Sequence, residues 1–334
     1  MAMGKARLLG RAALSAVLAG SLALGSGAVA ATAKDVDLTT SSRASVAKAY
    51  NRVLAPALGV KTGWSGSISS CKRGSESAAS RKATRKAVNF VRALNQLDEV
   101  TFNAKLNKKA LNTALLMHAN GSLSHAPTKS TFSKCWSGAG NLAASRSNLY
   151  LSRGYGTDLA PSTGARAIVG YMSDSGDGNL AVGHRRWILN PATRVMATGS
   201  TSRANALTVV GTRSSAKAAR PTYLEWPAKG WFPTQLEPNG RWSLSASSRS
   251  VSFARAKVKV QRVNAKGKVL KKHKVKVHRV QDGYGPHTIV FTVKGVKTPK
   301  AKKTVRLKVT VSGIKGAKKS KYSYTVKLFD PTKF

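Results

Sequence analysis

Acidic residues are scarce in this sequence: 57 Lys and Arg stand against only 12 Asp and Glu in 334 residues, a formal net charge of +45 at pH 7. Residues 241–334 are the extreme case, with 26 basic residues against two acids, Asp282 and Asp330. A charge of this size far exceeds what solubility requires and favours polyanionic surroundings. We therefore expect the partners to be anionic cell-wall polymers or glycans, with non-specific nucleic acid as an alternative.

Cysteine is nearly absent, since Cys71 and Cys135 are the only two. An even pair separated by a long stretch of chain predicts a disulfide in an oxidising compartment, which argues against a cysteine nucleophile. A serine hydrolase is also disfavoured, because the sequence has no Gly-x-Ser-x-Gly motif.

Apolar runs long enough to span a bilayer are missing as well, because spanning requires roughly 20 residues. The run from Ala12 to Leu24 is shorter; it follows three basic residues and precedes the small residues 25–30. This pattern predicts a secretory signal peptide over residues 1–30, with cleavage after Ala33 as an alternative. The mature chain would then be secreted and extracellular, either released or associated with the cell wall, without a transmembrane segment.

The mature chain keeps about 300 residues, a length typical of two domains. Helical spacing of apolar residues predicts three helices, over residues 80–97, 103–120 and 164–173. Two short strands are predicted at 194–199 and 206–211. This mixture indicates an α+β domain over residues 80–211, preceded by an N-terminal extension over residues 31–79 that contains Cys71.

Residues 212–240 contain four prolines together with Trp226, Trp231 and Phe232. Proline at this density breaks regular structure, so we predict a linker whose aromatic side chains dock against a domain. After it, apolar and polar residues alternate in five segments, 258–260, 275–277, 290–293, 305–309 and 322–328. This alternation predicts a Lys-rich, immunoglobulin-like β-sandwich over residues 241–334.

The middle of the chain holds three histidines. His118 lies near the end of a predicted helix and shares a face with Leu111, which favours simple packing. His125 and His184 lie in loops, and two such histidines with a nearby carboxylate are suited to bind a divalent metal such as zinc or to transfer protons. The alternative is that both rings are hydrogen-bonded parts of the structure.

Several motifs resemble, in order, those of the CAP (SCP-like) superfamily, in the branch found in secreted bacterial proteins. They are His118-Ala-Asn-Gly-Ser-Leu-Ser-His125, an Asn-Leu pair after a Gly-rich turn, and Gly183-His-Arg-Arg-Trp-Ile-Leu189, preceded by residues 88–94 and 100–102, which resemble the opening helix and turn. Several motifs in the right order are more specific than any one of them. The resemblance, over roughly residues 60–200, implies an α-β-α sandwich with a cleft lined by two histidines and two acids, which in some members binds a divalent metal.

Carried over motif by motif, the resemblance makes His125 and His184 the cleft histidines and Asp174 the second acid. The first acid is missing, because Gly140 stands in its place, or Ser147 if the register is shifted.

Loss of this acid bears on the chemistry of the cleft. The two histidines and Asp174 would still form a three-ligand metal site with an open water position. The missing Glu is the natural general base for that water, so its loss argues against hydrolysis unless Asp177 or His118 replaces it.

The preferred hypothesis is therefore a secreted, non-catalytic binding protein attached electrostatically to anionic cell-surface polymers by its basic C-terminal domain. The alternatives are a metal-dependent extracellular hydrolase that uses the His/His/Asp cleft and a small-lipid binding protein. Exposed arginines commonly have no specific role. We accordingly expect Arg185 and Arg186 to face solvent beside a buried Trp187, the alternative being that they attract an anionic ligand.

Overall fold

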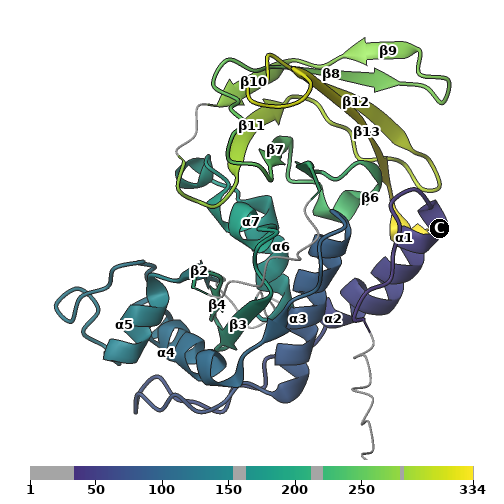
Figure 1. Ribbon diagram of the computed structural model, residues 1–334. Helices are drawn as coiled ribbons and strands as arrows, with labels where there is room; N and C mark the ends of the chain where they lie inside the picture. Colours follow the sequence, from purple (N-terminus) through teal and green to yellow (C-terminus); the bar gives the residue numbers. More distant parts are fainter. Residues whose placement is uncertain (1–33, 153–162, 212–220, 279–281, 334) are drawn as a thin grey trace, which may run out of the picture. The chain divides into compact units, whose positions relative to one another are not determined.

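The computed structural model describes residues 34–152, 163–211, 221–278 and 282–333 (Figure 1). The predicted signal peptide, residues 1–30, lies outside these ranges. Within them, no helix combines the length and the apolar character needed to cross a membrane.

The α-helices of the described chain lie in its N-terminal and middle parts, and two short 3-10 turns lie in the C-terminal part. The helical elements are α1 (Arg43–Ala49), the π-helical turn η1 (Tyr50–Leu54), α2 (Ala55–Leu58), α3 (Ala78–Ala93), α4 (Ala104–Asn120), α5 (Gly138–Ala144), α6 (Ala165–Ser173), η2 (Asp177–Asn179), α7 (Gly183–Ile188), η3 (Thr234–Leu236) and η4 (Pro331–Lys333). The three predicted helices are confirmed as α3, α4 and α6.

The ends of α4 follow from its capping residues. The Asn103 side chain accepts a hydrogen bond from the backbone N–H of Leu106 (3.0 Å), which satisfies a free donor of the first turn. Gly121 ends the helix at φ +60°, a left-handed conformation that glycine adopts without strain. The loop that carries His125 therefore begins at once after α4.

The first sheet has the strand order β1-β3-β4-β2. Its strands are β1 (Thr101–Phe102), β2 (Ser147–Leu151), β3 (Val195–Ser200) and β4 (Ala204–Thr208). Alternate residues of β4 face opposite sides: Ala204 and Ala206 pack in one cluster with α4, and Leu207 packs in another with α3 and α6. This part of the chain is therefore layered α-β-α, and the α+β class is confirmed.

Two further sheets form the C-terminal part (Figure 1). One has the order β10-β11-β7-β5 and the other β6-β13-β12-β8-β9. The strands are β5 (Tyr223–Trp226), β6 (Gly230–Pro233), β7 (Arg241–Ala246), β8 (Lys257–Val263), β9 (Val269–Lys272), β10 (Val275–His278), β11 (His287–Val293), β12 (Val305–Ser312) and β13 (Lys321–Phe329). All five predicted segments are strands, and most of their apolar residues pack in one buried cluster or against it, whereas Val277 of β10 is exposed.

The expectation that proline prevents regular structure in residues 212–240 is wrong for the described part. There, β5 pairs with β7 and β6 pairs with β13. Both are terminal strands of their sheets, a position that tolerates proline because one edge needs no ladder partner. The predicted docking is confirmed, since Trp226 and Phe232 are fully buried and meet edge to face with ring centroids 5.0 Å apart.

No regular element is predicted for residues 31–79, but α1, η1 and α2 follow one another there. Tyr50 packs edge-on against Phe90 of α3, with ring centroids 6.1 Å apart. Asn51 donates a hydrogen bond from Nδ2 to the carbonyl of Pro331 (2.8 Å). The N-terminal extension thus contacts both the α-β-α part and the end of the β part.

The predicted disulfide between Cys71 and Cys135 is confirmed. It joins the segment before α3 to the loop between α4 and α5, across 64 positions of sequence.

Replacing both cysteines with serine is expected to lower the free energy of unfolding by about 4 kcal/mol, because the open chain gains loop entropy when it unfolds. Denaturant unfolding of the wild type and of Cys71→Ser/Cys135→Ser measures the difference. A reductant should destabilise the wild type and leave the double variant unchanged. Equal stability of the two proteins under oxidising conditions would contradict the prediction.

Glu76 connects the same N-terminal segment to the first sheet. Its carboxylate is buried; Oε1 accepts from the Ser80 hydroxyl (2.6 Å) and Oε2 from the Ser200 N–H (3.0 Å). Burial raises the pKa of Glu76 to about 6, although both hydrogen bonds act in the opposite direction.

Because the pKa of Glu76 is higher in the folded state, the unfolded chain loses this proton first as the pH rises. The free energy of unfolding is therefore expected to fall by about 2 kcal/mol between roughly pH 4.5 and pH 6. Denaturation series across this range should show the decrease in the wild type and not in Glu76→Gln. Asp37→Asn, at an exposed acid, is the control and should keep it.

Candidate functional site

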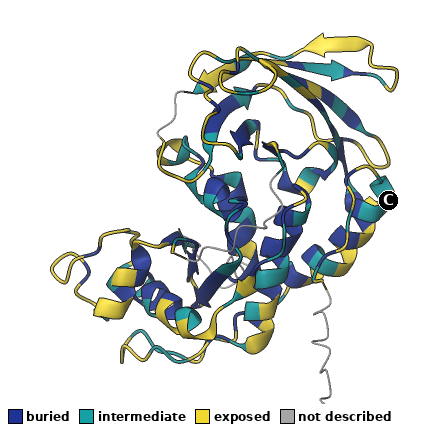
Figure 2. Cartoon of the chain, viewed as in Figure 1, coloured by how far each residue is buried: buried dark blue, intermediate teal, exposed yellow. Residues whose placement is uncertain are grey.

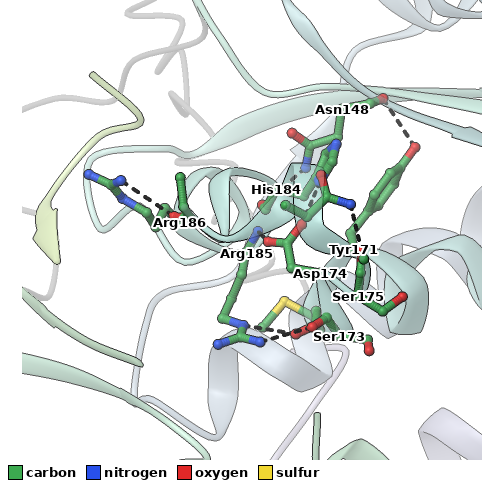
Figure 3. A network of polar contacts seen from close by, with 12 residues as sticks. Asn148, Tyr171, Ser173, Asp174, Ser175, His184, Arg185 and Arg186 are labelled. Carbon is green, nitrogen blue, oxygen red and sulfur yellow. Dashed lines mark hydrogen bonds and ion pairs between the residues drawn. The ribbon is translucent and has the colours of Figure 1, made fainter. Parts of the chain in front are cut away.

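Asp174 and His184 form a hydrogen-bonded pair between α6 and α7. The His184 Nδ1 lies 2.6 Å from the Asp174 Oδ1, and the backbone N–H of Arg185 donates to the Oδ2 (3.0 Å). The Asp174 side chain is completely buried. Figure 3 shows the Asp174 carboxylate next to His184 and Arg185 of α7. Both carboxylate oxygens are thus engaged by the first turn of this helix.

This contact fixes the orientation and the tautomer of His184. An ionised carboxylate only accepts hydrogen bonds, so the neutral ring carries its proton on Nδ1. The ring also stacks on Tyr171, with centroids 5.3 Å apart and planes 25° from parallel. Tyr171 is held in turn by its hydroxyl, which donates to the Oδ1 of Asn205 (2.8 Å). Nε2 is left as the ring nitrogen that can meet a ligand.

His125 is held in the same way by a weaker acceptor. Its Nδ1 donates to the carbonyl of Ala144 at the end of α5 (3.1 Å), which again leaves Nε2 without a partner among the described residues. Unlike His184, His125 is exposed.

Both histidines line a cleft of about 500 Å³. Other contributors include Ser147 of β2, Trp187 of α7, and Tyr284 of the loop between β10 and β11. A second cavity, of about 920 Å³, shares His125 and His184, and its wall includes Leu123, Val169 and Asp174. The structure therefore brings His125 and His184 to one cleft, as the sequence motifs imply.

The predicted metal site of His125, His184 and Asp174 does not fit this arrangement. A catalytic zinc site takes three protein ligands and a water, but both oxygens of Asp174 are engaged within the protein. In the part of the chain that the structure describes, no group of three or more His, Cys, Asp or Glu is placed to hold a metal ion. Asp174 is instead a positioning residue for His184.

The structure places the two candidate positions for the missing acid, Gly140 and Ser147, in different surroundings. Gly140 lies on α5, where an added Cβ would come within 3.2 Å of the carbonyl oxygen of Asn112 on α4. A side chain at Gly140 would therefore crowd α4 and the Ser137 hydroxyl, whose oxygen would lie 2.8 Å from the added Cβ, and these neighbours would have to shift. Ser147 lines the cleft, but its hydroxyl is buried and donates to the carbonyl of Ala143 (2.7 Å).

The two proposed substitutes for that acid lie elsewhere. His118 bonds through Nδ1 to the Thr201 hydroxyl (3.0 Å) and packs beside Trp64, and burial lowers its pKa. Asp177 is exposed in η2. Neither residue is among those that line the two described cavities. The structure thus offers no carboxylate base at the cleft among the described residues.

The expectation that Arg185 and Arg186 face solvent is wrong. Both are buried, with 1% and 2% of their surfaces exposed. Arg185 donates from Nε to the carbonyl of Met172 (2.8 Å) and from Nη1 to the Ser243 hydroxyl of β7 (3.0 Å). Burial lowers the pKa of Arg185 to about 10, while Asp174 acts to raise it.

Trp187, expected in the core, is partly exposed and lines the cleft. The periodicity of apolar residues did not predict that the arginines are buried and the tryptophan partly exposed. The reason is that α7 has fewer than two full turns, which is too short to define an apolar face. No sequence signal pointed to Tyr284 or Ser243, which reach the site from a separate part of the chain.

The comparisons with known proteins identify this region. The model of the CAP family, described as the Cysteine-rich secretory protein family, matches residues 85–211. No curated protein and no solved structure shows significant similarity to the chain. Residues 85–211 therefore form a CAP domain, which contains His125, Asp174, His184 and both buried arginines.

Asp174→Asn is expected to remove the preference of the neutral His184 ring for the Nδ1 proton, because an amide NH₂ can face the ring in place of a carboxylate oxygen. It should also lower the free energy of unfolding by about 2 kcal/mol, since buried hydrogen bonds to a charged carboxylate are lost or weakened. Nitrogen-15 NMR of the imidazoles and denaturant unfolding measure the two effects. Asp177→Asn carries the same charge change at an exposed site and should show neither.

Proposed function

Since residues 85–211 form a CAP domain, we propose that this protein is a secreted, non-catalytic binding protein of the bacterial CAP branch. In this proposal the β part attaches the molecule electrostatically to anionic cell-surface polymers. The single observation that carries the attachment is the strand register of the five-stranded sheet.

That register places basic side chains on the outer face of the sheet. In β12, Leu307, Val309 and Val311 are buried, so the alternate residues Arg306 and Lys308 face outward. Cross-strand partners share a face: Lys327 and Lys321 of β13, Lys257 and Lys259 of β8, and Lys272 of β9 fall in the same rows. These seven residues, which we call the cationic face, are Lys257, Lys259, Lys272, Arg306, Lys308, Lys321 and Lys327.

The cationic face is not balanced by acids. Arg306 lies directly opposite Lys327 in the ladder, an arrangement of like charges that destabilises a sheet. Within the described residues, none of the ion pairs involves a member of this face. Charges of either sign would keep an exposed sheet surface solvated, so solvation alone does not explain why only positive charges are present. Binding of a polyanionic partner explains better why the repulsion between like charges is tolerated.

The face favours a polymer backbone over stacked bases. Tyr324 is buried, and Tyr322 donates its hydroxyl proton to Glu225, so neither ring forms an exposed platform for a nucleobase. The outward positions between the basic residues are instead hydroxyl-bearing, for example Thr310 and Ser323, which bond to each other (3.0 Å). Regularly spaced phosphates or carboxylates of a cell-wall polymer match such a surface.

The finer fold assignment also belongs to this proposal. Strand order β5-β7-β11-β10 in one sheet and β6-β13-β12-β8-β9 in the other corresponds to an immunoglobulin-like A-B-E-D and A′-G-F-C-C′ arrangement. The disulfide supports secretion, because such bonds persist in oxidising compartments. The engaged carboxylate of Asp174 weighs against the metal-dependent hydrolase, which lacks its third ligand.

Lys257→Gln/Lys259→Gln/Lys308→Gln removes three exposed charges from the cationic face. We expect its affinity for a poly(glycerol phosphate) to fall by roughly two orders of magnitude at about 0.1 M salt, because each lost phosphate contact releases one counterion fewer. The slope of log affinity against log salt should become shallower by about three. Calorimetric titration over a salt series measures both quantities.

The matched control is Lys105→Gln/Lys109→Gln/Lys129→Gln, which removes the same charge from exposed positions of the CAP domain. Equal losses in the two triple variants would mean that net charge, and not the cationic face, causes binding. Tighter binding to single-stranded nucleic acid than to the phosphate polymer at equal charge would favour a nucleic acid partner instead.

A further inference from the structure

The loop Asp282–Pro286, between β10 and β11, is anchored to α7 of the CAP domain. Arg186 donates from Nη2 to the carbonyl of Pro286 (3.0 Å), and the same nitrogen lies 3.8 Å from the Asp282 carboxylate. The Arg186 guanidinium carbon lies 5.5 Å from the centroid of the Tyr284 ring. Since Arg186 is itself buried, the loop is held by a fixed side chain.

Tyr284 is thereby placed in the lining of the CAP cleft. Its ring lies so close to Gly183 that an added Cβ there would come within 2.9 Å of a ring carbon. Only glycine permits this approach, one residue before His184. Tyr284 lines the same cleft as Trp187 and the two histidines, and it remains 36% exposed. The β part therefore completes a wall of this cavity.

The lining of the cleft has a specific chemical character. Tyr284 and Trp187 supply aromatic surface, on which the C–H face of a sugar ring packs. The Nε2 atoms of His125 and His184 accept hydrogen bonds when the rings are neutral, which suits hydroxyl donors.

The charge of the cleft lining indicates the charge of the ligand. Arg146 is one of the lining residues, is exposed, and forms no ion pair among the described residues. None of the described residues that line this cleft is Asp or Glu. A carboxylate or phosphate on the ligand would therefore meet a guanidinium without a competing acid. The volume of about 500 Å³ lies within the range of small-ligand sites and accommodates one or two rings.

We infer that the cleft is a binding site for a sugar ring that bears an anionic group, with Tyr284 as a specificity-determining residue contributed by the β part. The inference rests on the proposed binding role of the CAP domain, but it does not depend on the cationic face. The anionic group is either a carboxylate or a phosphate, and the two sources are separated by the choice of probe.

The test is a ligand-observed NMR titration of the full mature protein with glucuronate, glucose 6-phosphate, glucose and inorganic phosphate. One of the two anionic sugars is expected to bind about tenfold more tightly than either glucose or phosphate alone. Tyr284→Ala should weaken that binding about tenfold, whereas Tyr284→Phe, which keeps the ring, should stay within about twofold of the wild type. Arg146→Gln should remove the advantage of the anionic sugar over glucose.

The triple lysine variant of the cationic face separates this inference from the proposed function. This variant should bind the anionic sugar with the affinity of the wild type, although its affinity for the phosphate polymer is reduced. Inorganic phosphate that binds as well as the anionic sugars would overturn the inference, because the site would then recognise the charge and not a ring. Unchanged sugar binding by folded Tyr284→Ala would overturn it equally.

Discussion

The structure around the cleft depends on one buried carboxylate in a chain with very few acids. Asp174 accepts from the side chain of His184 and from the backbone of Arg185, so one side chain sets both a cleft group and the start of α7. A completely buried carboxylate is tolerated only where its oxygens are hydrogen-bonded. Asp174 therefore serves best as an internal anchor, and a metal would have to compete with these contacts for it.

The helix anchored by Asp174 also joins the two parts of the molecule. Successive residues of α7 point to different partners: His184 to the cleft, Arg185 to β7 and Arg186 to the loop before β11. Burying two guanidinium groups is costly, and carbonyl and hydroxyl acceptors offset that cost. Acceptors from two regions of the sequence meet each arginine, so the cleft and the β part share one packing arrangement.

The excess positive charge is distributed unevenly over this framework. Arg185 and Arg186 of α7 are buried and donate to carbonyl oxygens, whereas the lysines of β8, β9 and β12 are mostly exposed (Figure 2). The planar guanidinium retains several fixed hydrogen bonds when buried, and the strongly hydrated ammonium of lysine remains in water. Net charge alone therefore does not describe the protein: one set of cations holds the fold together and another is available to a partner.

The sequence by itself determined the features that depend on neighbouring residues. Helical spacing of apolar residues was enough for α3, α4 and α6, alternation for β8 and for β10 to β13, and ordered motifs for the CAP domain and for the pair His125 and His184.

Tertiary structure alone decided how distant groups meet. It made Asp174 an anchor instead of the expected ligand and buried Arg185 and Arg186. It also placed the proline-rich segment at the sheet edges as β5 and β6, and it brought Tyr284 to the cleft. Local patterns record which side chains can be buried or charged. They do not record which acceptor, strand edge or ring from another part of the chain will be within reach, because these contacts form only when the packed layers meet.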